Sequence, residues 1–279
     1  MLKLQTDASF ARHQAPEDQL IAAALMENDR RYFRAGATIE QLSNWKIIWT
    51  PGFRDLPAAC VIEPLGDASF PPPEVLDRLR ALGIPEVRFY HTRSILKALP
   101  LKPDYAVSQE IAYVTDASSL AAPEFDKDIH VRPLRDTEDN IKVALFESRD
   151  KRPDGKASDA RDYVALERLK IDCGYMQGFI IEYRGTPAAC FGLSISSSLV
   201  RMKNLLTSKN MTGRGCGTAI VQFAIQYAQQ QQIPHVGVFA IKGGSGQRLY
   251  ERCGMRPVGI QTEFSAPLRA SLNGSETCQ

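Results

Sequence analysis

The chain has 279 residues, of which 44% are hydrophobic and 24% are charged, and its formal net charge is +2. These fractions are typical of a soluble globular protein, and the balanced charge does not predict nucleic acid or an anionic membrane as a partner. No apolar run approaches the ~20 residues that cross a bilayer, and the first residues are too polar for a signal peptide, so we expect a cytoplasmic protein. The 6 cysteines lack CxxC spacing and there are only 4 histidines, so no metal site is predicted.

The first half of the chain alternates patterns of helices and strands. After an unpatterned arm, apolar residues at helical spacing predict a helix over residues 16–33. A proline-headed run closed by Gly83 predicts a second helix, and residues 94–99 predict a short third one. The small, polar run 115–124 contains a proline and predicts a linker. The predicted strands of this half are residues 45–49, 58–65, 84–90 and 105–114.

The second half repeats this alternation of elements. Helices are predicted over residues 136–148 and 157–171, and a third opens at Thr218. The polar end of the chain predicts a frayed tail. The predicted strands are residues 130–134, 179–183, 188–196, 199–207 and 235–241.

Two short motifs occur in both halves. Pro-Ala-Ala-Cys stands at 57–60 and at 187–190, and Ile-Pro-x-Val stands at 84–87 and at 233–236. The offsets of 130 and 149 residues differ by 19, which predicts that the first half lacks a segment that the second half keeps. We favour a duplicated fold whose first copy has lost its ligand loop. The alternative is one complete domain behind an unrelated α/β domain.

A glycine-rich turn joins a predicted strand to a helix in the second half. Gly213, Gly215 and Gly217 follow the strand that ends at Thr207, and Thr218 opens the helix. A helix N-terminus binds phosphate through amides that have no partner within the helix. The glycine spacing does not fit the dinucleotide fingerprint, and the lysine of the triphosphate P-loop is absent. A tight turn without a ligand is the alternative.

Two motifs resemble those of the GNAT N-acetyltransferase superfamily. Residues 212–217 resemble its pyrophosphate loop, Arg/Gln-x-x-Gly-x-Gly/Ala, with Thr212 in the place of Arg or Gln. Residues 249–255 are similar to its Leu-Tyr-x-x-x-Gly-Phe motif, and Gly243 stands where the family usually has Asn. The resemblance implies an α/β (α+β) fold of two tandem GNAT-like domains, each with a mixed, mostly antiparallel, twisted sheet flanked by helices. The expected units are 1–120, a degenerate copy without the loop; 128–267, the catalytic domain; and 268–279, the tail.

The same resemblance implies a donor site and a reaction. An acyl-CoA would lie along the strand and the turn, with the backbone N–H of Leu206 facing the developing oxyanion and Tyr250 protonating the leaving thiolate. Cys216 could be a nucleophile but is favoured as a packing residue. The expected donor-binding residues are Leu205, Leu206, Thr207, Thr212, Gly213, Arg214, Gly215, Cys216, Gly217, Thr218 and Gly243.

The general base and the acceptor stay open. Glu147, Asp150 and Glu182 are candidate bases, although a solvated charge is the favoured interpretation of each. If the first half is a degenerate copy, it could wall the acceptor cleft with Trp45, Trp49, Tyr90 or His91, although core packing explains the tryptophans better.

The leading hypothesis is an N-acyltransferase that moves an acetyl or short acyl group from acyl-CoA to the amine of a small molecule by direct attack. One alternative keeps the fold with a carrier-protein, tRNA or longer acyl donor. The other is a non-catalytic module that binds CoA or a partner. A monomer or homodimer fits each of them.

Overall fold

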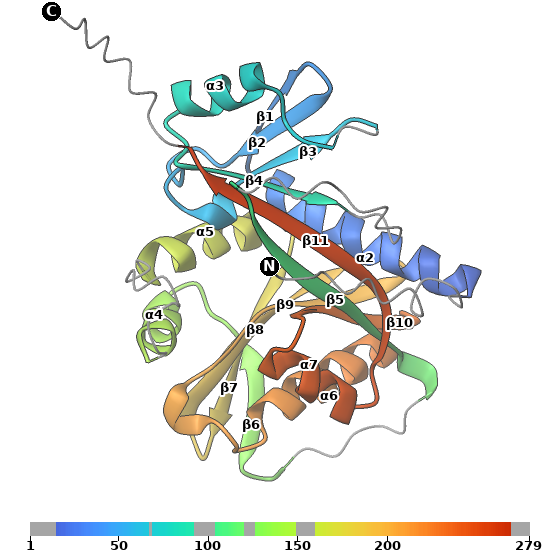
Figure 1. The fold of residues 1–279 in the computed structure, drawn as a ribbon. Helices are drawn as coiled ribbons and strands as arrows, with labels where there is room; N and C mark the ends of the chain where they lie inside the picture. Colours follow the sequence, from blue (N-terminus) through green and yellow to red (C-terminus); the bar gives the residue numbers. More distant parts are fainter. Residues whose placement is uncertain (1–14, 67–68, 92–103, 120–125, 149–159, 269–279) are drawn as a thin grey trace, which may run out of the picture.

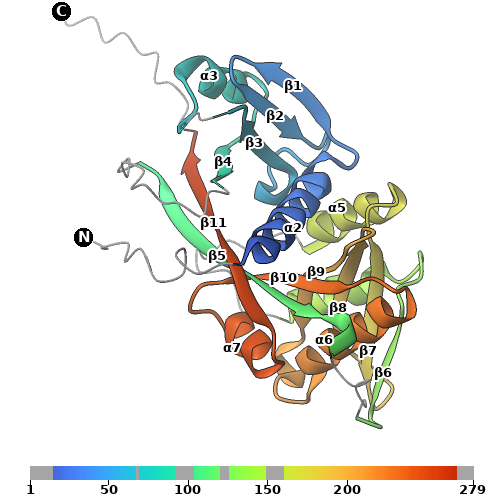
Figure 2. The same ribbon diagram turned by 90° about the vertical axis from the view of Figure 1, so that its right-hand side faces the viewer.

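The computed structural model of the chain describes residues 15–66, 69–91, 104–119, 126–148 and 160–268. The described strands form one mixed sheet of 11 strands in the order β1-β2-β3-β4-β11-β5-β10-β9-β8-β7-β6 (Figure 1). Helices cover both faces of the sheet (Figure 2). No helix among the described residues is long and apolar enough to cross a membrane.

The elements follow the predicted alternation, and β1, α7 and β11 are additions that the sequence patterns missed. The predicted strand 45–49 and the helix from residue 16 are confirmed. The predicted helix 94–99 lies outside the described residues. The first half contains α2 (Pro16–Arg34), β1 (Thr38–Leu42), β2 (Trp45–Trp49), η1 (Pro57–Ala59), β3 (Cys60–Pro64), α3 (Pro73–Ala81), β4 (Glu86–His91), β5 (Ala106–Asp116) and η2 (Ala117–Ser119). The second half contains β6 (Ile129–Pro133), α4 (Asp139–Glu147), α5 (Ala160–Asp172), β7 (Gln177–Tyr183), β8 (Thr186–Ile195), β9 (Leu199–Thr207), η3 (Lys209–Met211), α6 (Cys216–Gln230), β10 (His235–Ile241), α7 (Ser245–Arg252) and β11 (Arg256–Pro267).

The two halves exchange their last strands. β5 of the first half lies between β10 and β11 of the second half, and β11 lies between β5 and β4 of the first half. β5 and β11 run antiparallel side by side across the middle of the molecule (Figures 1 and 2). Thr115 and Asp116 belong to β5, so the predicted linker begins later than the sequence indicated. Each half therefore completes the sheet of the other.

Strand alternation places a separate helix layer on each face of the second half. Phe179 and Ile181 of β7 pack in one apolar cluster with Ile220 of α6. Ile180 lies between them in the sequence and packs in another cluster with Leu145 of α4. Because successive strand residues point to opposite faces, α6 and α4 cover opposite sides of the sheet.

The topology matches the five strands β1 to β5 of the first half with β7 to β11 of the second half, in that order, and β6 has no counterpart among the described residues. Only one of the two sequence motifs follows that match. β3 and β9 each pair in parallel with the strand after the next helix, β4 and β10. The two Ile-Pro motifs precede these equivalent strands, and the amides of Ile84 and Ile233 close equivalent turns on the carbonyls of Leu79 and Ala228. The Pro-Ala-Ala-Cys motifs lie at β3 in one half and in β8 in the other. That second match is coincidental.

The expected deletion in the first half is wrong. The connection from β3 to α3 spans residues 65–72 and that from β9 to α6 spans 208–215, which are equal lengths. The 19-residue difference in offset has two causes. The two Pro-Ala-Ala-Cys motifs lie on strands that do not correspond, and α3 has 9 residues where α6 has 15. The loop chemistry does differ: Pro72 caps α3 and Pro73 opens it. Proline has no N–H, so this helix offers little to a phosphate.

Candidate active site

The strands β9 and β10 diverge toward their C-terminal ends. Their parallel pairing ends with Gly237 opposite Arg201, although β9 continues to Thr207 and β10 to Ile241. The outer edges remain paired, since β9 pairs with β8 and β10 with β5. Two unpaired strand edges therefore face one gap, and such edges can take up an extended ligand through backbone hydrogen bonds.

The glycine-rich turn lies at the end of this gap and leads into α6. Gly213 and Gly215 have φ of 80° and 79°, a left-handed conformation that favours glycine. Gly217 serves another purpose, because a Cβ there would lie 2.9 Å from Cδ2 of Leu249 on α7. The first and second glycines shape the turn, and the third allows α6 and α7 to approach closely.

The amides of the first turn of α6 are available to a ligand. The first helical hydrogen bond runs from the Ala219 N–H to the Gly215 carbonyl, which leaves the three preceding amides without helical acceptors. Two of the expected loop amides are occupied within the turn: those of Thr212 and Arg214 donate to Lys209 and Met211. Fewer backbone amides of the turn are therefore available to a ligand than the sequence indicated.

The predicted role of the Leu206 amide conflicts with the register of β8 and β9. Leu206 lies opposite Cys190, and two residues later the Ser208 N–H donates to the Ala188 carbonyl. Amides two residues apart point to the same edge, so the Leu206 amide is directed to β8 and the Thr207 amide to the gap. The bulge before Leu206, where Asn204 has a φ of 54°, was not visible in the sequence.

Two side chains predicted to belong to the site, Tyr250 and Cys216, are buried. Tyr250 on α7 is 5% exposed and its ring packs against Tyr113 of β5, with centroids 6.0 Å apart. Burial raises the pKa of Tyr250 above its ordinary value, so the hydroxyl keeps its proton at neutral pH. Burial also raises the pKa of the Cys216 thiol. A thiol that resists ionisation favours the packing role of Cys216.

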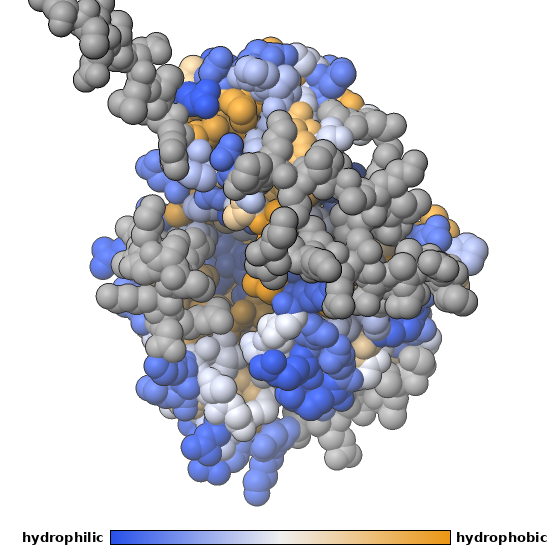
Figure 3. All heavy atoms as spheres, viewed as in Figure 1, coloured by the Kyte–Doolittle hydropathy of each residue, from blue (hydrophilic) through white to orange (hydrophobic). Residues whose placement is uncertain are grey.

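A cavity of about 210 Å³ adjoins β9 at the bulge. Its walls combine three aromatic rings with the backbone of the strand, and Tyr32 reaches it from α2 of the first half. Phe146 and Tyr163 stack with their ring centroids 6.2 Å apart. The surface is hollowed between the first-half elements and the lower part of the second half, with hydrophobic atoms deep in the hollow (Figure 3). Its lining residues include Tyr32, Phe146, Tyr163, Glu167, Asn204 and Leu205.

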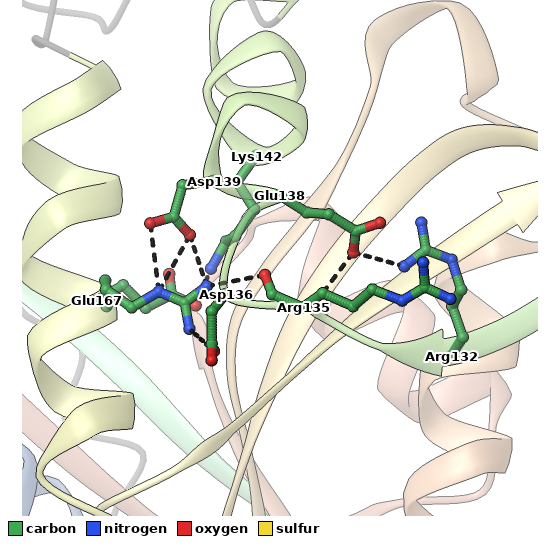
Figure 4. A network of polar contacts seen from close by, with 8 residues as sticks. Arg132, Arg135, Asp136, Glu138, Asp139, Lys142 and Glu167 are labelled. Atoms are coloured by element: carbon green, nitrogen blue, oxygen red, sulfur yellow. Dashed lines mark hydrogen bonds and ion pairs between the residues drawn. The ribbon is translucent and has the colours of Figure 1, made fainter.

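One carboxylate lines this cavity, and the sequence analysis missed it. Glu167 on α5 forms a buried ion pair with Lys142 of α4. Figure 4 shows this pair beside a polar network in which Arg132 and Arg135 contact Glu138. Lys142 and Glu167 lie on two different helices that each carry other charged residues. The sequence therefore does not single them out, and only the packing of α4 on α5 reveals the ion pair.

Of the predicted bases that the structure describes, Glu147 and Glu182, neither lines the cavity. Glu182 lies on β7, where its carboxylate accepts a hydrogen bond from Arg132 at 2.7 Å. Glu147 is an exposed residue at the end of α4. Asp150 lies outside the described residues. Trp45 and Trp49 are core residues, as favoured, and Tyr90 lines a different cavity in the first half.

A divergent strand pair beside a helix N-terminus with free amides is the arrangement that the GNAT resemblance implied. Residues 143–255 match the family model described as the acetyltransferase (GNAT) family. A search of curated proteins gives no match.

Solved structures show the same fold at low identity. A functionally unknown conserved protein from Staphylococcus epidermidis is 13% identical with a TM-score of 0.65, over 85% of this chain and 96% of that one. A GCN5-related N-acetyltransferase from Kribbella flavida is 13% identical with a TM-score of 0.61, over 91% and 97%. A tandem GNAT protein from the clavulanic acid biosynthesis pathway is 10% identical with a TM-score of 0.58, over 95% and 97%. Residues 143–255 thus match the GNAT acetyltransferase family model, and the whole chain has the tandem GNAT fold.

Proposed function

We propose that the chain is an N-acyltransferase that moves an acetyl or other short acyl group from acyl-CoA to the amine of a small molecule. The observation that carries this proposal is the gap between β9 and β10 beside the free amides of α6. A pantetheine arm has amide groups that can pair with unpaired strand edges, and a pyrophosphate is a ligand for a helix N-terminus.

The donor would lie with its pyrophosphate on the amides of Cys216, Gly217 and Thr218. The exposed turn around them leaves room for a ligand, and the nearby cation Arg214 adds positive charge. The pantetheine would run along the gap toward the bulge at Asn204 and Leu205. A backbone amide of the open β9 edge beside the bulge, rather than that of Leu206, would then face the thioester carbonyl.

The reaction is a direct transfer from sulfur to nitrogen. The neutral amine attacks the thioester carbonyl carbon, a C–N bond forms, and the carbonyl oxygen gains negative charge that a fixed backbone N–H stabilises. The C–S bond then breaks, the leaving thiolate takes the proton of Tyr250, and Tyr250 regains a proton from water, which in turn receives the proton that the amine gave to the base. The amine loses one proton to a base, for which Glu167 is the carboxylate that the cavity provides.

The acceptor would enter from the aromatic cavity, which adjoins β9 where the thioester would end. Three rings and Leu205 favour a neutral amine with a compact apolar body. Through Tyr32, the first half would contribute to the acceptor-binding surface.

The test is calorimetric titration of acetyl-CoA into the full chain. We expect micromolar binding with one molecule per chain, because Pro72 and Pro73 remove the corresponding amides from α3. Gly215→Glu should abolish binding. Gly83→Glu is the matched control, since Gly83 has a similar φ of 72° with open space around it in the first half. A folded chain that does not bind acetyl-CoA would contradict the proposal.

A further inference from the structure

The first half contains its own cavity, of about 200 Å³, which the proposed reaction does not use. β3 and β4 are bridged only by Ile62 opposite Phe89, and the cavity lies where these strands then diverge. It is therefore the counterpart of the second-half gap. The lining residues that matter here are Met26, Arg30, Phe33, Lys46, Glu63 and Tyr90.

This cavity is not suited to CoA. The helix that follows β3 is capped by Pro72 and begins with Pro73, so it lacks the row of amides that a pyrophosphate needs. The cavity is instead lined by opposite charges close to one another. Its ligand should therefore be small and carry matching charges of both signs.

Glu63 lines this cavity, and one of its two carboxylate oxygens has no partner among the described residues. Its Oε2 accepts a hydrogen bond from Arg34 at 2.7 Å, and its side chain is 13% exposed. Its Oε1 is buried and has no hydrogen-bond partner among the described residues. A buried carboxylate oxygen without a donor is costly, so a ligand with an N–H or ammonium group would be favoured there.

Lys46 places a positive charge beside that acceptor. It lies directly opposite Glu63 in the antiparallel pairing of β2 and β3, where side chains share a face with Cβ atoms about 5 Å apart. Within the described part of the chain, no ion pair of Lys46 is found. Arg30 also lines the cavity and pairs with Glu27 at 3.5 Å. The carboxylate of Asp29 is already engaged by Arg201 and Lys203.

We propose that this cavity is a second ligand site that binds a free α-amino acid. The ammonium group of the ligand would lie against the carboxylate of Glu63, and its carboxylate would lie against Lys46, with Arg30 adding positive charge. An α-amino acid carries these two groups on one carbon, which suits a directly opposed pair of charged residues. Its side chain would pack against Met26, Phe33 and Tyr90.

The experiment measures the apparent Tm of the purified full chain with each of the twenty standard L-amino acids at ~10 mM, since a ligand that binds only the folded state raises Tm. At least one amino acid should raise Tm in a dose-dependent way. Its analogues that lack the amino group or the carboxylate should not. Absence of a shift with all twenty would overturn the proposal.

Variants locate the site. Lys46→Met and Glu63→Gln should each weaken binding of the active amino acid at least tenfold in calorimetry. Arg31→Gln is the matched control, because Arg31 is an exposed cation on α2 next to Arg30. Binding that persists in both cavity variants, or is lost equally in the control, would overturn the proposal. Gly215→Glu should bind the amino acid normally, so failure of the donor site and failure of this site are distinguishable.

Discussion

Tyr250 shows how burial changes the protonation chemistry of a single side chain. Its ring is held between α7 and β5, and burial favours the neutral hydroxyl over the phenolate. A raised pKa means that the proton stays on the oxygen beyond the ordinary pH range of tyrosine. Such a group can give a proton to a thiolate and cannot act as a base at neutral pH.

We predict that Tyr250→Phe lowers kcat by about 100-fold and leaves the affinity for acetyl-CoA unchanged, since only the proton donor is removed. Steady-state kinetics with an accepted amine and calorimetry with acetyl-CoA measure the two effects. Because the pKa of Tyr250 is raised, the native enzyme should not lose activity through this group below about pH 10.

The control for this prediction is Tyr227→Phe, which removes an exposed hydroxyl of α6 with a long contact of 3.4 Å to Gln177. It should keep the native kcat. Full activity in Tyr250→Phe would show that the ring has only a packing role.

At the scale of elements, α2 connects the two halves through buried charges. Asp29 lies 2.6 Å from Arg201 and 2.7 Å from Lys203, both on β9. The ammonium of Lys203 also lies 4.0 Å from the ring centroid of Tyr32. Burial by itself raises the pKa of Asp29, but the two cations outweigh it and hold the pKa well below its ordinary value. The ion pairs thus fix α2 beside the bulge of β9.

We predict that Asp29→Asn destabilises the fold by about 3–5 kcal/mol at pH 7, because two buried cations lose their counter-charge. Because the pKa of Asp29 is lower in the native state than in the unfolded state, its carboxylate stabilises the fold at pH values above the unfolded pKa of about 3.9. This stabilisation is lost progressively as the pH falls below that value. Denaturant unfolding at pH 7 and pH 3 should therefore show a smaller difference between variant and native protein at pH 3.

Asp77→Asn is the control for Asp29→Asn. It removes the same kind of carboxylate from an exposed ion pair, since the side chain of Asp77, which contacts Arg80, is 71% exposed. It should cost less than about 1 kcal/mol. A cost for Asp29→Asn that is equally small, or that grows toward acid pH, would contradict the assignment.

At the scale of the whole molecule, the exchange of β5 and β11 makes the two halves interdependent. Without β5, the facing edges of β10 and β11 would be unpaired, and exposed strand edges aggregate. The domain boundaries expected from the sequence, 1–120 and 128–267, therefore separate segments that share one sheet.

We predict that residues 128–267 expressed alone are insoluble or lack native tertiary structure, and that co-expression with residues 1–120 restores a soluble complex. Size-exclusion chromatography and near-UV circular dichroism measure both outcomes. A monomeric 128–267 fragment with a cooperative unfolding transition would contradict the prediction. The full chain purified in the same way is the control.

The sequence by itself determined the features that depend on neighbouring residues. Strand 45–49 follows from its apolar run, and the turn at Gly213 and Gly215 follows from a backbone conformation that glycine adopts most readily. The glycine-rich motif at 212–217 and the motif at 249–255 predicted the family and the fold. The family model agrees with the first prediction, and the solved structures agree with the second.

The tertiary structure decided the features that depend on distant partners. The strand exchange pairs Val114 with Arg256, and the cavity combines Tyr32 with Glu167, residues more than a hundred positions apart. Local periodicity carries no information about such partners. The direction of the Leu206 amide also depends on register against β8, and one bulge at Asn204 changes it. Local rules therefore set the elements, and packing and strand register set the site.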